Sequence, residues 1–182
     1  MSKKLPSDFS AEKYGLSVRL VNESDTDFIL SLRTDKELSK YLHQTDEDVK
    51  KHLKWYNEYK TREIEGRDYY FIYHKDGKPV GLNRIYNICD YYGTIGSWIC
   101  PVDNDPETSI GTYFFMLDIL FEQLSLSLSV FDVRKNNTHV WKLHKIVGAQ
   151  SIGESDVDYY FYINKQTYIN NREKLLQLFN LK

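Results

Sequence analysis

The sequence predicts a single α/β (α+β) domain in which a mixed, mostly antiparallel, twisted sheet carries helices on both faces. Three observations lead to this prediction. The chain has 182 residues, which is within the usual size of one domain. Its hydrophobic fraction of 41% and charged fraction of 27% are ordinary for a globular protein. Strand-like and helix-like hydrophobic patterns follow one another in the order β, α, α, β, β, β, α, β, α, β, with no repeated unit.

The first 15 residues are predicted to form a flexible leader, so that the domain itself spans residues 16–182. The leader is polar and is interrupted by Pro6 and Gly15, which disfavour regular structure. Its lysines are followed by no apolar core of the length that a signal peptide needs. No segment approaches the roughly 18 continuous apolar residues of a membrane span. We therefore expect no membrane contact.

Three elements are predicted in the N-terminal third. Polar and apolar residues largely alternate over 17–22, which predicts a half-buried strand. Ser24 is a suitable cap for a helix with acidic residues in its first turn, where they favour the helix dipole. A second helix is expected after Thr45, because Asp48 follows at the capping-box spacing and apolar residues recur at helical spacing to about Arg62.

A group of three antiparallel strands is predicted next. Residues 69–73 are aromatic and β-branched, which favours a strand. Asp76 and Gly77 supply the positive φ angles of a tight hairpin turn, so residues 79–88 are expected to return as the partner strand. Residues 93–100 are expected to form the third strand of this group.

The C-terminal half is predicted to contain three helices and two strands. An acidic loop with two prolines precedes the most apolar helix, which should be buried on most of its surface. The expected elements are a helix over 110–124, a strand over 126–133, a helix over 137–147, a strand over 157–164 and a helix over 166–180. Together with the earlier segments they complete a mixed sheet with helices packed on it.

Charge and cysteine content exclude several classes of function. Lys and Arg total 24 against 26 Asp and Glu, and no stretch concentrates the basic residues, so nucleic acid is not an expected partner. Cys89 and Cys100 form no CxxC pair, and no histidines lie at ligand spacing, so no metal is expected and a reducing cytoplasm is indicated. The aromatic share of 15% suits either sheet faces or a pocket for a polar, ring-shaped substrate.

Residues 121–149 resemble the GNAT superfamily of N-acetyltransferases. That family has a helix ending in Phe-x-x-Leu, a strand, and then Asn-x-x-Ala/Ser-x-x-Leu-Tyr-x-x-x-Gly-Phe. The matching residues here are Phe121, Leu124, Asn137, Leu143 and Gly148. The sequence departs from the pattern where Val140 replaces Ala or Ser, His144 replaces Tyr and Ala149 replaces Phe. With the order of elements included, the resemblance covers residues 17–164 and implies a GNAT fold.

Two shorter motifs point to branches within the superfamily. Residues 95–99, Ile-Gly-Ser-Trp-Ile, are similar to the Ile-Gly-Tyr-Trp-Leu strand of the branch that includes the ribosomal-protein N-terminal acetyltransferases. The motifs His52-x-x-Trp55 and Leu143-His144-Lys145 resemble bacterial GNAT enzymes that acetylate nucleotide-linked aminodeoxy sugars for surface glycans such as lipopolysaccharide. The resemblance implies an enzyme that uses acetyl-CoA as acyl donor.

The resemblance also implies where acetyl-CoA binds. In the family, the pantetheine arm pairs with the main chain of a strand opened from its neighbour, which falls on Trp98, Ile99 and Cys100 here. The pyrophosphate is expected at the N-terminus of the apolar helix, where free amides and the helix dipole favour anions. The candidates there are Thr108, Ser109, Ile110, Gly111 and Thr112, in a loop that is acidic and poor in glycine. Asn137 is expected to contact the cofactor arm, to cap the following helix, or both.

His144 is the predicted catalytic residue. It occupies the place of the family's Tyr, which protonates the departing thiolate, and a reference pKa of about 6.5 leaves some imidazolium at neutral pH. The alternative is a hydrogen-bonded core histidine, because Val140, His144 and Val147 share a helical face. No general base is assigned, because Thr94 stands where relatives carry Glu. A water chain to a carboxylate, or binding of an already neutral amine, are the open alternatives.

Six polar and aromatic residues of the first helices and the third strand are predicted to wall the acceptor side. A nucleotide-linked sugar would offer them a ring for stacking and phosphates for ion pairing. They are Arg33, Tyr41, His52, Trp55, Tyr56 and Arg84. Each is also explicable as a packing or surface residue.

Three functions stay open from the sequence. The first is acetylation of an amino sugar, with a nucleotide-linked sugar as the expected small-molecule partner. The second, within the enzyme class, is acetylation of a protein N-terminus or of a small amine such as an antibiotic or polyamine. The third is a catalytically inactive GNAT-like binding module, which the acidic loop and Thr94 favour. A homodimer is compatible with the sequence, although no residue indicates one.

Overall fold

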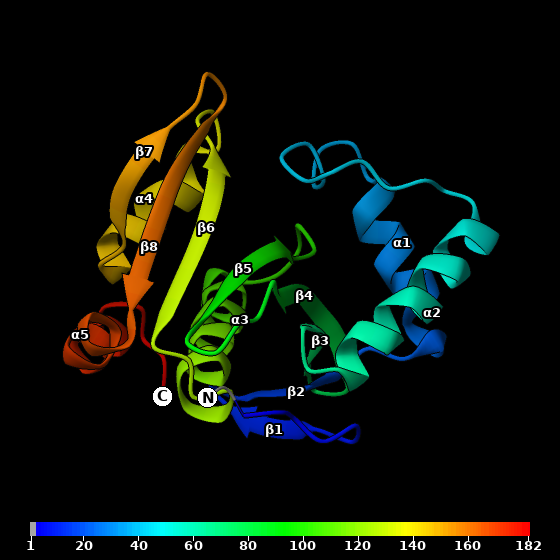
Figure 1. Ribbon diagram of the computed structural model, residues 1–182, viewed down its shortest axis with the longest axis horizontal. Helices are drawn as coiled ribbons and strands as arrows, with labels where there is room; N and C mark the ends of the chain where they lie inside the picture. The colour runs from blue at the N-terminus through cyan, green and yellow to red at the C-terminus, as the bar shows by residue number, and fades with distance from the viewer. Residues whose placement is uncertain (1–2) are drawn as a thin grey trace.

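The computed structural model describes residues 3–182 as one eight-stranded sheet with helices on both faces (Figure 1). The strand order is β1-β2-β3-β4-β5-β6-β8-β7, and only β5 and β6 run parallel. The strands are β1 (Ser10–Lys13), β2 (Leu16–Leu20), β3 (Asp68–Lys75), β4 (Lys78–Tyr86), β5 (Tyr92–Ile99), β6 (Leu128–Arg134), β7 (Gln150–Glu154) and β8 (Asp158–Asn164). The helices are α1 (Thr26–Thr34), α2 (Val49–Ile64), α3 (Pro106–Asp118), α4 (Thr138–Val147) and α5 (Lys165–Leu178). The mixed, mostly antiparallel architecture is therefore confirmed.

The helices divide between two hydrophobic cores, one on each face of the sheet. The larger core lies under α3, α4 and α5, and it includes every hydrophobic residue of α3 from Tyr113 to Leu117. The smaller core joins α1 and α2 to β3, β4 and β5, with Tyr59 and Tyr70 completely or almost completely buried. An all-round apolar helix such as α3 is stable only when it is covered on most sides, as it is here.

The sheet opens between β5 and β6. These two parallel strands pair only at Tyr92 with Leu128 and at Gly93 with Ser129. The Ser129 hydroxyl donates to the Gly93 carbonyl over 3.1 Å, which holds the strands together at the last paired position. Beyond this point they separate, as Figure 1 shows. The rest of β5 therefore has one edge without a strand partner.

A β-bulge in β5 lies directly beside this opening. Leu82 pairs with Ile99 and Arg84 pairs with Gly96, so two residues of β5 stand opposite one residue of β4. Ser97 takes up the extra length with a φ of 51°, in the left-handed region. A bulge bends its strand and increases the local twist, so it turns the end of β5 away from β6.

The prediction of a flexible leader over 1–15 is wrong for residues 3–15. β1 pairs along its whole length with β2, and Phe9 is buried against Phe71. The backbone N–H of Leu5 also donates to the Tyr69 hydroxyl over 3.0 Å. The segment is polar because it forms an edge strand, in which alternate residues face solvent. Residues 1–2 lie outside the described part of the chain.

A buried carboxylate ties this N-terminal segment to the helices. Asp118, at the end of α3, accepts hydrogen bonds from Tyr14, Tyr168 and Arg172 and forms an ion pair with Lys13. Burial alone would raise the pKa of Asp118, but the hydrogen bonds from Arg172, Lys13 and Tyr14 outweigh it and lower that pKa. The cluster thus joins the first strand, α3 and α5.

The remaining differences from the predicted elements are local. β7 was not predicted because all its residues are exposed and show no alternating pattern. The apolar helix begins at Pro106 and not at residue 110, and it continues from Ile119 to Gln123 as a π-helical turn. Asn22, and not Ser24, caps a short 3-10 turn that leads into α1. No helix within residues 3–182 is long and apolar enough to cross a membrane.

Candidate functional site

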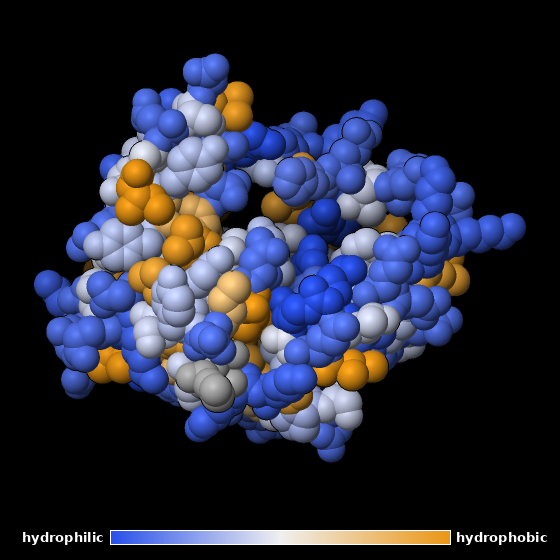
Figure 2. Space-filling view, in the orientation of Figure 1, coloured by the Kyte–Doolittle hydropathy of each residue, from blue (hydrophilic) through white to orange (hydrophobic). Residues whose placement is uncertain are grey.

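Two adjoining cavities lie where the sheet opens. The strand cleft, of about 130 Å³, lies between β5 and β6 and is bordered by Trp98, Tyr113, Asn137 and His144 among others. The helix cavity, of about 410 Å³, lies between β4 and the helices α1 and α2. His43, Tyr86 and Ser97 line both cavities. Figure 2 shows this face of the molecule hollowed between the part formed by β6 and β8 and the part formed by α1 and α2.

Gly96 and Ser97 shape the wall that the two cavities share. A Cβ on Gly96 would lie 3.0 Å from the ring of Tyr86, so only glycine lets this ring lie against the backbone of β5. Ser97 follows at the bulge and lines both cavities. Sequence reasoning missed Tyr86 and Ser97, because nothing in a single sequence marks the residue at which a strand bulges.

The predicted strand residues Trp98, Ile99 and Cys100 lie beside the opening. The Trp98 indole N–H donates to the Thr112 hydroxyl over 2.9 Å, which fixes the ring against α3. Ile99 points to the opposite face and packs in the smaller core. The Cys100 sulfur lies 3.6 Å from the Thr112 oxygen and is mostly buried. Their side chains are therefore structural, and what they can offer a ligand is the unpaired main chain of β5.

The expected pyrophosphate site at residues 108–112 does not present bare amides. The carboxylate of Asp105 caps α3 and accepts from the backbone N–H of Thr108 over 2.7 Å, and the Ser109 N–H donates to the Asp105 carbonyl. Ile110, Gly111 and Thr112 lie past the first turn, where helical amides bond within the helix. The helix starts four residues earlier than the pattern indicated, so these amides are not bare, and pyrophosphate binding at the five residues stays a prediction.

Asp105 brings negative charge to this helix end. Hydrogen bonds from Thr108 and from the Lys75 ammonium, 3.0 Å away, lower the pKa of the Asp105 carboxyl, so it is ionised at neutral pH. A phosphate at the same place would be repelled by this carboxylate, and the ion pair with Lys75 reduces the repulsion.

Asn137 stands at the N-terminus of α4 and lines the strand cleft. Its side chain makes no capping hydrogen bond, so the expectation of a cap is wrong. The Asn137 amide is consequently available to a molecule in the cleft. Its contact with a cofactor stays a prediction.

His144 lines the inner end of the strand cleft and is only 5% exposed. Its Nδ1 lies 2.7 Å from the Tyr113 hydroxyl, and its ring packs on Phe131 with centroids 4.3 Å apart. Burial lowers the pKa of His144 to about 3. Burial therefore disfavours the imidazolium that a general acid would need at neutral pH, because the charged form would lose its hydration, and the catalytic role of His144 stays a prediction.

Four of the six predicted acceptor residues line the helix cavity: Arg33, His52, Trp55 and Arg84. Tyr41 lines the strand cleft instead, where its hydroxyl donates to the Asn136 carbonyl over 3.2 Å. Tyr56 does not reach either cavity, because it is buried in the smaller core. Tyr56 lies in the apolar stripe of α2, whereas His52 and Trp55 lie at the border of that stripe. Helical spacing in the sequence alone does not distinguish the stripe from its border.

Arg84 and Arg33 make the helix cavity cationic. Arg84 forms an ion pair with Asp68 and lies 5.6 Å from the Trp55 ring and 5.1 Å from the Tyr86 ring. Arg33 donates to the Thr45 hydroxyl and the His43 carbonyl, each over 3.0 Å, and pairs with no carboxylate among residues 3–182. Burial, and then the charge of Arg84, lower the pKa of Arg33.

His52 lies next to Arg33 in the same cavity. Burial, and then the charge of Arg33, lower the pKa of His52, so its imidazole is neutral at neutral pH. Its ring stacks at a tilt on Trp55 with centroids 5.5 Å apart. Its Nε2 is buried without a hydrogen-bond partner among residues 3–182. Buried polar atoms normally have partners, so this atom and Arg33 together favour a polar ligand.

Thr94, which stands where a carboxylate base was sought, pairs with Tyr86 in the sheet and lies outside both cavities. The residues described by the structure include no group of three or more His, Cys, Asp or Glu side chains that could hold a metal ion.

Comparisons with known proteins complete the description of the site. No protein-family model matches the sequence, and no curated protein matches it. The chain is 30% identical to apo FdhC, described as a nucleotide-linked sugar GNAT, over 92% of this chain and 97% of that chain, with a TM-score of 0.83. A spermidine N-acetyltransferase from Vibrio cholerae, in complex with CoA and spermine, is 18% identical over 86% and 99% of the two chains (TM-score 0.75). RimJ from Mycobacterium smegmatis, in complex with CoA-disulfide, is 17% identical over 91% and 92% (TM-score 0.72).

Proposed function

Because this chain belongs to the GNAT superfamily and is an acyl-CoA-dependent N-acetyltransferase, we propose that it transfers the acetyl group of acetyl-CoA to the amino group of a nucleotide-linked aminodeoxy sugar. One observation carries the proposal. The helix cavity, with an aromatic ring and two arginines on its wall, opens at Ser97 onto the unpaired edge of β5. A ring-shaped, anionic acceptor and an extended acyl donor can therefore meet at one point.

The strand cleft supports the donor half of this function. A strand edge without a partner offers alternating N–H and C=O groups, and an amide-containing chain such as the pantetheine arm can pair with it as an added strand. The edge of β5 beyond Gly93 is such an edge. A backbone N–H at the bulge would also be placed to stabilise the oxyanion of the thioester carbonyl.

The charge of the helix cavity favours a sugar nucleotide over a polyamine or a protein N-terminus. Arg33 and Arg84 both line it, and Arg33 has no carboxylate partner among residues 3–182. A polycationic acceptor would meet repulsion from these side chains, whereas the phosphates of a sugar nucleotide would be attracted. Trp55 on the cavity wall adds an aromatic surface against which a sugar ring could lie.

The chemical step needs no charged histidine. The neutral amine attacks the thioester carbon, so that a C–N bond forms, and the tetrahedral intermediate then loses the thiolate as the C–S bond breaks. The proton that the amine nitrogen carries in excess passes to the thiolate sulfur, directly or through water. The positive charges of Arg33 and Arg84 favour binding of the amine in its neutral form, because an ammonium beside them would be repelled. The product would be an N-acetylated sugar nucleotide, made in the cytoplasm and consumed by glycosyl transfer into surface polysaccharide or lipopolysaccharide.

Release of the CoA thiol with a panel of acceptors tests the proposal. We expect turnover with UDP- or dTDP-linked amino sugars and at least tenfold lower kcat/KM with spermidine or N-terminal peptides. Faster turnover of spermidine or a peptide than of every sugar nucleotide would refute the proposed acceptor. Titration calorimetry with acetyl-CoA tests the inactive alternative, which requires that no donor binds.

A further inference from the structure

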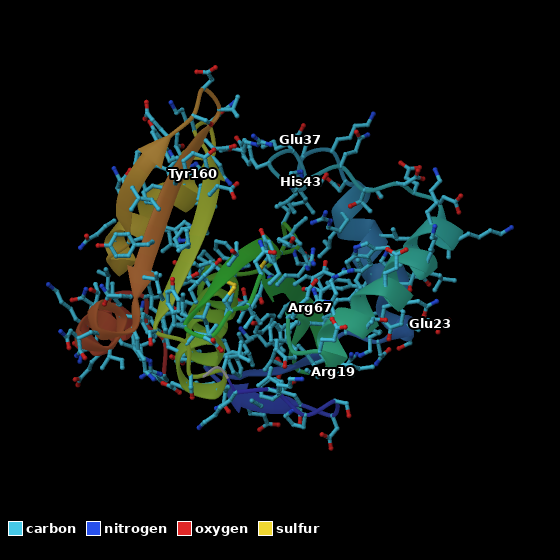
Figure 3. All side chains as sticks on the ribbon, viewed as in Figure 1. Arg19, Glu23, Glu37, His43, Arg67 and Tyr160 are labelled. Carbon is cyan, nitrogen blue, oxygen red and sulfur yellow. The ribbon has the colours of Figure 1, made fainter. Side chains whose placement is uncertain are left out.

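A third hollow, the arginine groove, adjoins the helix cavity on the same face of the sheet. It has a volume of about 680 Å³ and is lined by Arg62, Arg67 and Arg84 together with Asp68, Tyr86 and Tyr92, among others. Arg84 and Tyr86 line the helix cavity as well, so the two spaces share a wall. Figure 3 labels Arg67 near the middle of this face, between His43 above and Arg19 below.

The charges of the groove do not balance. Asp68 is 2% exposed and is the only carboxylate on its lining, where it pairs with both Arg62 and Arg84. One negative charge between two guanidinium groups leaves one positive charge, and Arg67 adds a second. Arg67 pairs with Glu65 outside the groove, but both side chains are about half exposed, at 59% and 45%. An exposed pair of this kind is weak and exchanges readily for a better anion.

Some hydrogen-bond donors of the groove also have no partner among residues 3–182. Arg62 reaches Asp68 only through Nε, over 3.0 Å, so its two η nitrogens have no protein partner among residues 3–182. Arg84 uses Nε and one η nitrogen on Asp68. Planar guanidinium groups with free edges match the oxygens of phosphate, and Asp68 holds two of them in place.

Aromatic side chains complete the lining. Tyr86 borders the part of the groove shared with the helix cavity, and Tyr92 begins β5, two residues before Thr94, which pairs with Tyr86. Neither ring belongs to a hydrophobic core, and both side chains are only partly buried. An exposed ring beside a cationic groove suits a flat, polar heterocycle.

We propose that the arginine groove binds the nucleoside diphosphate half of the acceptor. The inference rests on the proposed function and adds a location to it. The sugar occupies the helix cavity with its amine at Ser97, the diphosphate passes Arg84 to reach Arg62 and Arg67, and the base faces Tyr92. In this arrangement the thioester and the nucleotide lie at opposite ends of the sugar.

Calorimetry with dTDP and UDP, which carry no sugar, tests the inference directly. We expect both nucleotides to bind the intact protein and to bind Arg67→Gln and Arg62→Gln roughly tenfold more weakly, since a hydrogen bond to a charged group contributes about this factor. Lys40→Gln is the matched control, because Lys40 is 48% exposed, pairs with Glu37 at the surface and lines neither hollow. Arg67→Gln should raise KM for the nucleotide-linked sugar about tenfold, whereas Lys40→Gln should leave it unchanged.

Two outcomes would overturn the inference. One is equal affinity of wild type and both arginine variants for dTDP and UDP. The other is a loss of nucleotide affinity in Lys51→Gln, at the far end of the helix cavity, with the arginine variants unaffected. If the protein turns over sugar nucleotides but neither Arg62→Gln nor Arg67→Gln weakens the binding of dTDP and UDP, the inference is wrong and the proposed function still holds. Arginine-dependent nucleotide binding without turnover of any amino sugar would instead contradict the proposed function.

Discussion

The Tyr113 hydroxyl lies 2.7 Å from Nδ1 of His144, and both side chains are enclosed between α3, α4 and β6. This contact gives Nδ1 a hydrogen-bond partner, and His144 forms no ion pair with a carboxylate among residues 3–182. Burial holds the pKa of His144 at about 3. The pair therefore stays uncharged throughout the physiological range, and two predictions depend on this state.

His144 should make the protein less stable in mild acid. A histidine whose folded pKa is below its unfolded value, about 6.5, takes up protons on unfolding, so stability is complete above pH 6.5 and falls as the pH drops toward 3. At pH 5 the loss should be roughly 2 kcal/mol. Urea unfolding of wild type and His144→Gln at pH 7.5 and pH 5 measures it. The prediction fails if the variant loses as much stability as the wild type over this interval.

The same residue should contribute little acid catalysis. Because His144 is neutral, we expect His144→Gln, which can still hydrogen-bond to Tyr113, to keep more than about one tenth of kcat, since loss of a true general acid costs roughly 100-fold or more. The pH profile of kcat should be the same for both proteins between pH 6 and 8. The prediction is wrong if kcat of the wild type falls with a pKa near 6.5 while kcat of the variant does not change with pH. The imidazolium of His144 would then be the proton donor.

Replacing Ser97 by glycine should stabilise the fold. Ser97 has a φ of 51°, which a non-glycine residue adopts at a cost of about 1 kcal/mol. We expect Ser97→Gly to raise the free energy of unfolding by about 0.5 to 1 kcal/mol without changing KM for acetyl-CoA. The matched control is Ser151→Gly in the extended edge strand β7, which should lower stability. Denaturant midpoints compare the two, and destabilisation at Ser97 would show that the hydroxyl has a structural role.

Removing the charge of Asp105 should tighten donor binding. Asp105→Ser keeps an oxygen to cap α3 but removes a carboxylate from the helix end where a pyrophosphate was expected. An exposed charge of this kind is worth about 0.5 to 1 kcal/mol, so KM for acetyl-CoA should fall roughly threefold at low salt and less at high salt. An unchanged or higher KM would place the pyrophosphate away from α3.

Arg33 should act on the acceptor alone. Because Arg33 lacks a carboxylate partner among residues 3–182 and lines the helix cavity, Arg33→Gln should raise KM for the acceptor about tenfold and leave KM for acetyl-CoA unchanged. Arg33→Lys keeps the charge and should recover part of this loss. Steady-state kinetics with each substrate varied in turn separates the two constants. Equal changes in both would mean that the substitution disturbs the whole site.

Local signals were reliable wherever neighbours in the chain decide the conformation. Asp76 and Gly77 have the positive φ angles of the predicted hairpin turn, whereas the cap of α2 is Asp48 and not Thr45, three residues later than the capping-box spacing indicated. These features depend on backbone sterics and on hydrogen bonds within a few residues. The predicted residues Arg33, His52, Trp55 and Arg84 also meet in one cavity, because α1, α2 and β4 fold as expected.

Other features had no such local signal. β1 and β7 are edge strands without buried residues, so neither has the apolar residues whose alternation reveals a strand. The start of α3 depends on Asp105, whose capping role the glycine-poor loop did not reveal. Tyr56 and His52 are four residues apart on one helix, yet only the packing of α2 on the sheet separates the core residue from the cavity residue.

The chain's own residues were sufficient to establish the class of fold, the order of its main elements and the resemblance to N-acetyltransferases, since these follow from periodicity, turns and motifs within short stretches. The separation of β5 from β6, the neutrality of His144 and the meeting of Arg62, Arg67 and Arg84 in one groove came only from the folded molecule. Each depends on distances and on exclusion of water between segments far apart in the chain, and neither quantity is encoded in any local pattern.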